Sequence, residues 1–195
     1  MKKVLFFTLL SALMIGIAGC SSTPEAEKAK AQRPLFDDFQ KMSTKILESG
    51  GIAVVGLGES KSLELALNKA KTRGRVELAQ LLETKIEALQ KDFVEETGLA
   101  NDAQILAQFS STAQAITSQQ IKGSVAKELK YEILKGTVTA YALMELDPKL
   151  IMNQLEKEKE LYTRFRATKA FENLDAEIKE YEAYKKAQQD ALMAQ

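Results

Sequence analysis

The chain has 195 residues, with 27 basic and 27 acidic side chains, and its apolar fraction of 45% is high enough to build a globular core. That length suits one ordinary domain, or a small domain with appended helices. The chain contains no histidine, which excludes His-based catalysis and His-ligated metals. The lack of a basic surplus argues against a nucleic-acid partner.

The N-terminus has the pattern of a secretory signal peptide. A basic start is followed by an apolar stretch from Val4 to Ala18. This stretch is shorter than the ~20 apolar residues that a membrane span needs. We therefore interpret residues 1–19 as a signal peptide that is removed from the mature protein.

The only cysteine, Cys20, follows the small residues Ala18 and Gly19 directly. This placement resembles the bacterial lipobox, in which the cysteine sulfur takes a diacylglyceryl group and the new amine is acylated, for example with palmitate. The alternative is an ordinary signal peptide with a chance cysteine. Lipidation would consume the only thiol and anchor the protein to a membrane without spanning it. In the sorting rules of the lipoproteins that this pattern resembles, an aspartate after the cysteine signals retention at the inner membrane. Ser21 at this position therefore predicts the outer membrane.

The next segments alternate between polar and periodic patterns. Residues 20–33 are the lipidated N-terminus and a polar, flexible tether. Residues 34–49 have the spacing of a short amphipathic helix. Residues 52–58 form a β-branched strand that ends in glycines, and residues 63–96 a long amphipathic helix capped by Ser60 or Ser62.

A second helix is expected over residues 101–118. Two alternating runs around the Lys135-Gly136 turn then predict an antiparallel hairpin. Its second strand alternates over 137–146, and a charged C-terminal helix follows over residues 151–195. The first strand of the hairpin is expected to be half-exposed, with its apolar residues facing the core of the domain. These residues are Val125, Leu129, Tyr131 and Ile133.

This order of elements predicts an α+β fold. A small three-stranded sheet is packed by a long helix, in the order β-α-α-β-β-α, with an extended C-terminal helix.

Small and aliphatic residues recur at packing positions of this domain. They are Val54-Val55-Gly56-Leu57-Gly58-Glu59, Leu65-Ala66, Ala70, Arg75, Leu78, Ala79 and Ala142-Leu143-Met144-Glu145-Leu146-Asp147. With the lipobox, the pattern resembles the LPP-twenty family of small bacterial lipoproteins, which includes flagellar outer-membrane lipoproteins. Over residues 50–150 the resemblance implies a compact β-α-β-β domain, an outer-membrane anchor and a tendency to self-assemble. It implies no catalytic residues.

No catalytic, cofactor-binding or metal-binding residue is predicted. Gly56-Leu57-Gly58 lacks the third glycine of a dinucleotide-binding loop, so we expect it to provide a sharp turn into the helix. Gly74, inside a helix, is interpreted as a point of close approach to the sheet. The neighbouring carboxylates Asp37-Asp38 and Glu95-Glu96 do not face each other on a helix, so a solvated face is expected.

The C-terminal helix carries a candidate assembly seam, formed by Phe171, Leu174, Ile178 and Tyr181 at spacings of three and four. The seam is too short for a stable isolated helix, so it must pack on its own domain or on another copy. The aromatic residues here are interpreted as packing residues, and ligand binding is the alternative: Tyr162, Phe165, Phe171, Tyr181 and Tyr184.

The sequence therefore predicts a non-enzymatic outer-membrane lipoprotein that faces the periplasm. It would act in an envelope or flagella-associated structure as a homo-oligomer, or by docking envelope or flagellar proteins. The alternative is a lipid-anchored periplasmic binding module for a small ligand or an envelope polymer. A third hypothesis is an enzyme whose catalytic groups are carboxylates alone.

The anchor yields a first prediction. Cys20→Ser removes the site of acylation and should leave a protein that no longer fractionates with membranes, because stable anchoring needs two or more acyl chains. Membrane fractionation after a salt wash measures this. Retention of the Ser variant on washed membranes would place the anchor elsewhere.

Overall fold

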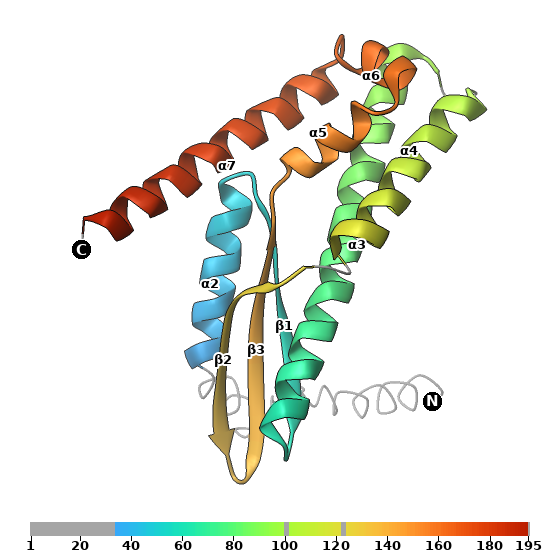
Figure 1. The fold of residues 1–195 in the computed structure, drawn as a ribbon. Helices are drawn as coiled ribbons and strands as arrows, with labels where there is room; N and C mark the ends of the chain where they lie inside the picture. Colours follow the sequence, from blue (N-terminus) through green and yellow to red (C-terminus); the bar gives the residue numbers. More distant parts are fainter. Residues whose placement is uncertain (1–33, 100–101, 122–123, 195) are drawn as a thin grey trace, which may run out of the picture. The chain divides into compact units, whose positions relative to one another are not determined.

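A computed structural model describes residues 34–99, 102–121 and 124–194 of the chain (Figure 1). The predicted signal peptide, Cys20 and the tether lie outside these residues, so the expectations for them stay predictions. Within the described ranges, no helix combines the length and the apolarity needed to cross a membrane.

The elements follow the predicted order and confirm the α+β class with its three-stranded sheet and long helices. They are α2 (Pro34–Glu48), β1 (Ile52–Ser60), α3 (Leu63–Thr97), α4 (Ala103–Ile116), the π-helical turn η1 (Thr117–Ile121), β2 (Ala126–Leu134), β3 (Thr137–Leu146), α5 (Lys149–Leu155), α6 (Lys159–Phe165) and α7 (Lys169–Met193).

The sheet is antiparallel, and its strand order is β1-β3-β2. The central strand is therefore β3, which pairs Ala142 with Gly56 of β1 and Ala140 with Tyr131 of β2. A two-residue turn joins β2 to β3. Both turn residues have positive φ, 50° at Lys135 and 77° at Gly136, as in the type I′ turns that favour tight hairpins.

Helices cover both faces of the inner strands. The long helix α3 packs on one face of β1 and β3, while α2 packs on the other. Tyr141 and Leu143 of β3 point to the α2 side and are buried against Phe39. We expected one buried face for this strand. That expectation was incomplete, because α2 closes the second face.

Close contact between α3 and β1 is set by small residues. A Cβ atom on Gly56 would overlap the carbonyl oxygen of Ala70, and one on Gly58 would overlap that of Ala66. A Cβ on Gly74 would lie 3.4 Å from the Cα of Gly56. The interpretation of Gly74 as a contact point is confirmed. The expected sharp turn at the strand glycines is wrong, since β1 continues to Ser60 and these glycines serve packing instead.

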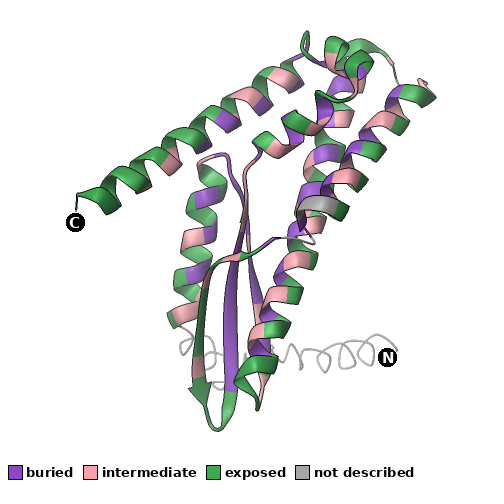
Figure 2. Cartoon of the chain, in the orientation of Figure 1, coloured by how far each residue is buried: buried purple, intermediate pink, exposed green. Residues whose placement is uncertain are grey.

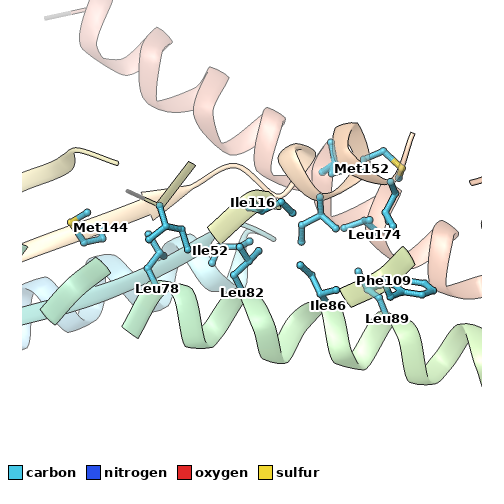
Figure 3. Packing of buried hydrophobic residues seen from close by; sticks show 14 of the residues in the cluster. Ile52, Leu78, Leu82, Ile86, Leu89, Phe109, Ile116, Met144, Met152 and Leu174 are labelled. Carbon is cyan, nitrogen blue, oxygen red and sulfur yellow. The ribbon is translucent and has the colours of Figure 1, made fainter. Parts of the chain in front are cut away.

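The two halves of α3 serve different parts of the core. Ser62 caps its N-terminus, where the hydroxyl accepts from Leu65 N, and Gly98 ends it in the left-handed conformation. Beyond the sheet, Phe93 meets Phe109 of α4 at 5.6 Å and Phe165 of α6 at 6.3 Å between ring centroids. Figure 3 shows α3 residues Leu78, Leu82, Ile86 and Leu89 in one continuous cluster with side chains of the sheet and of the other helices.

The expected single helix over residues 151–195 is interrupted twice. The chain forms α5, α6 and then the long C-terminal helix α7. Thr168 caps α7, because its hydroxyl accepts from Phe171 N at 3.3 Å. The carboxylate of Glu96 on α3 accepts from Lys169 N at 2.8 Å and from Ala170 N at 3.3 Å, so contacts from elsewhere in the chain help to start this helix.

The glycine contact yields a second prediction. Gly56→Ala should lower the free energy of unfolding by about 1–3 kcal/mol, because the added methyl group meets helix backbone that cannot rotate away. Glu83→Ala alters an exposed position of α3 and should change the free energy of unfolding by less than ~0.5 kcal/mol. Urea unfolding followed by circular dichroism measures both. Equal losses would show that α3 does not need this close approach.

Candidate assembly surface

The predicted assembly seam on α7 packs inside its own chain. Leu174 and Ile178 are buried in the main core, the cluster that α3 forms with the sheet and the other helices, and Phe171 is half-buried against it. Tyr181 is buried in the smaller cluster that α2 forms with the other face of the sheet. Burial raises the pKa of Tyr181, whose hydroxyl donates to the carboxylate of Glu145. The expectation that this seam is an assembly surface is therefore corrected, because its side chains have no exposed stripe to offer.

Strand β2 instead exposes apolar side chains. Leu129, Tyr131 and Ile133 lie on the α3 side of the sheet and are 41%, 48% and 63% exposed. We call these three residues the β2 stripe. Their expected burial was wrong, because α3 runs over β1 and β3 and hardly reaches the outer strand. Figure 2 shows the contrast between the largely exposed β2 and the buried β3 beside it.

The opposite face of β2 is charged. Lys130 lies 2.6 Å from Glu128, and the hydroxyl of Tyr141 donates to Glu132 at 2.6 Å. The ammonium of Lys130 also lies 5.9 Å from the ring centre of Phe39 on α2. One face of the strand is thus apolar and the other carries alternating charges.

The two edges of the sheet differ. At the β1 edge, Lys69 Nζ donates to the carbonyl oxygen of Glu59 and Arg73 Nη1 to that of Leu57, both at 3.0 Å. These α3 side chains occupy backbone acceptors on which another strand would need to pair. Among the described residues, β2 pairs with β3 alone.

The start of β2 is held in place from two sides. Arg75 of α3 donates to the carbonyl oxygen of Ser124 through Nη2 at 2.9 Å and through Nε at 3.3 Å. Lys127 pairs with Glu145 of β3 at 2.5 Å. Contacts from α3 and from β3 therefore fix the position of the start of β2.

A shallow groove offers an alternative site. It has a volume of about 260 Å³ and lies between α5, α6 and α7, where Tyr162 and Phe171 pack edge to face at 6.3 Å. Burial and the hydrogen bond to Glu156 raise the pKa of Tyr162, and the hydrogen bond to Glu182 raises that of Lys149. Both shifts favour the protonated form, which is the wrong direction for a base or a nucleophile.

Of the neighbouring carboxylates Asp37-Asp38 and Glu95-Glu96, three have structural partners. Asp38 lies 3.6 Å from Lys41, Glu95 lies 3.8 Å from Lys91, and Glu96 caps α7. Across the part of the chain that the structure describes, no three acidic or cysteine side chains gather as metal ligands would.

Comparison of the chain with protein-family models, with curated proteins and with solved structures found no match. Any function must therefore be argued from the sequence pattern and from the geometry of the sheet.

The difference between the α7 seam and the β2 stripe yields a third prediction. Leu174→Ala should cost about 2–5 kcal/mol of unfolding free energy, because it opens a cavity in the core. Ile133→Thr keeps the β-branched shape at an exposed position and should cost less than ~0.5 kcal/mol. Urea midpoints compare the two variants. A larger loss from Ile133→Thr would mean that β2 is covered.

Proposed function

We propose that this chain is a non-enzymatic outer-membrane lipoprotein of the LPP-twenty type that works in the cell envelope by self-assembly or protein docking through β2. The observation that carries the proposal is the combination of an open strand edge with an exposed apolar stripe on the same strand. The structure that it would serve is an envelope assembly or a flagella-associated one.

An exposed apolar strand edge is a liability for a protein that works alone. Such an edge invites pairing with other chains, and soluble proteins usually protect it. This chain protects β1 with Lys69 and Arg73 but leaves the β2 stripe uncovered in the described residues. The asymmetry is expected when one edge is reserved for a protein partner.

The N-terminal pattern supports the location. An acylated Cys20 would anchor the chain, and the polar residues 21–33 would reach about 40 Å when fully extended. Such a tether would hold the folded part, residues 34–194, away from the lipid on the periplasmic side. Many copies on one membrane would be concentrated for lateral contact.

The second candidate function is a lipid-anchored binding module. The groove beside Tyr162 and Phe171 favours it, because aromatic rings and charged groups converge there. Its volume of about 260 Å³ is below the ~300–1,000 Å³ typical of small-molecule sites. Lys149 and Glu182 in its lining also pair with each other at 2.9 Å. The β2 surface is therefore the stronger candidate.

The proposed function yields a fourth prediction. A triple change of Leu129, Tyr131 and Ile133 to Ser should abolish self-association and partner cross-linking, because it removes the apolar contact area. The melting temperature should fall by no more than a few degrees, since all three positions are exposed. Light scattering of the protein in detergent and cross-linking in intact cells measure the two effects.

Val76→Ser is a matched control, since Val76 is exposed on α3 away from the stripe. It should leave both readouts unchanged. An unchanged assembly state and unchanged cross-links in the triple variant would refute the assembly role of β2. Loss of ligand binding in Tyr162→Ser with no effect of the stripe would favour the binding module.

A further inference from the structure

The backbone groups that β2 leaves open belong to the stripe residues. Leu134 and Thr137 flank the two-residue turn Lys135-Gly136 and face each other across the hairpin. Turns of this kind close with a hydrogen bond between the two flanking residues. Residues that bond to the partner alternate along an antiparallel strand. The even-numbered residues of β2 therefore bond to β3. The N–H and C=O groups of Leu129, Tyr131 and Ile133 point to the open edge.

We propose that β2 pairs antiparallel with β2 of a second copy of this chain, with the two-fold axis at Tyr131. This inference rests on the proposed function of β2 and names its partner. In this register Tyr131 faces Tyr131, and Leu129 faces Ile133 in both directions. All six side chains come from the two β2 stripes and lie on one face of the joined sheet.

The charges on the other face fit the same register. Lys130 of each copy lies opposite Glu132 of the other, so the pairing creates two cross-strand ion pairs of opposite sign. Opposite charges at directly facing positions stabilise a pair of strands, and like charges destabilise it. The alternating charges of β2 thus become complementary when the strand meets its own copy.

Neighbouring registers lose this match. An axis at Lys130 sets Lys130 against Lys130 and Glu128 against Glu132. An axis at Glu132 sets Glu132 against itself. An axis at Leu129 matches Glu128 with Lys130, but it draws Val125 into the ladder across the irregularity between Ala126 and Glu128. A bulge at that point breaks the regular bonding that the axis at Tyr131 keeps.

The pairing closes on itself. A two-fold interface uses the same patch on both copies. The joined sheet has the order β1-β3-β2-β2-β3-β1, and its outer edges are the two β1 strands. Those edges carry Lys69 and Arg73 on their backbone acceptors. The sheet therefore stops at two copies, which separates a defined dimer from open-ended aggregation.

Single cysteines test the register. In full-length chain carrying Cys20→Ser no other thiol is present. Tyr131→Cys should form a disulfide-linked dimer under mild oxidation, because facing Cα atoms in a bonded pair lie about 5.5 Å apart, within disulfide reach. Leu129→Cys should not, since its copy would be displaced by roughly 13 Å along the strands. Non-reducing gels of the purified protein give the readout.

Mixed cysteines keep the stripe intact. Chains with Lys130→Cys mixed with chains carrying Glu132→Cys should cross-link to each other, while each alone should not. Cross-linking of Lys130→Cys with itself, or of Leu129→Cys with itself, would assign another axis and overturn the proposed register.

Charge reversal tests the complementarity. Lys130→Glu should weaken the dimer at least about tenfold, because it faces Glu132 twice. Adding Glu132→Lys should restore the dissociation constant to within about threefold, since the pairs are then reversed. Lys186→Glu, an exposed change of the same sign on α7, should have little effect. Analytical ultracentrifugation measures the constants, and thermal melting confirms that each variant is folded.

Failure of the two-fold pairing can be distinguished from failure of the proposed function. If the triple Ser variant of the stripe loses assembly but no thiol pair on β2 cross-links, the two-fold pairing is wrong and docking through β2 still stands. If the triple variant assembles like the parent, both the pairing and the proposed function fall.

Discussion

Close packing of α3 on β1 is the constraint on which the rest of the structure depends. Gly56 and Gly58 leave no side chain between strand and helix, and Gly74 lets the helix backbone approach in return. Glycine permits this close approach of two backbones, and a close-packed contact tolerates little displacement of the helix. The C-terminal half of α3 then supports Phe109 of α4 and the other helices that close the main core.

The same constraint explains why β2 is left open. A helix locked over β1 and β3 does not extend over a third strand, so none of the described residues covers the α3 side of β2 as α3 covers β1 and β3. Cationic side chains from that helix reach the β1 edge, where Lys69 and Arg73 bond to strand carbonyls. The helix that holds the sheet together therefore also decides which of its edges is closed. The assembly role that we propose for β2 rests on this asymmetry.

Much of the fold was predictable because it depends on local pattern. The hairpin is predictable from its alternation and its Lys135-Gly136 turn, and α3 from its apolar face, with Ser62 as one of its two proposed caps. These signals act over a few residues and need no knowledge of distant neighbours. The seam on α7 was found by the same periodicity, but periodicity does not tell whether an apolar stripe meets its own chain or another.

By itself, the sequence determined the α+β class, the order of elements and the apolar faces of α3 and α7. Tertiary structure decided which faces are covered. Leu174 and Ile133 both follow apolar periods, yet one is buried and the other 63% exposed. The breaks before α6 and α7 and the capping of α7 by Glu96 of α3 were likewise decided by the packed chain. The physical reason is that burial depends on elements distant in sequence, whose positions follow from packing and are not encoded in any local window.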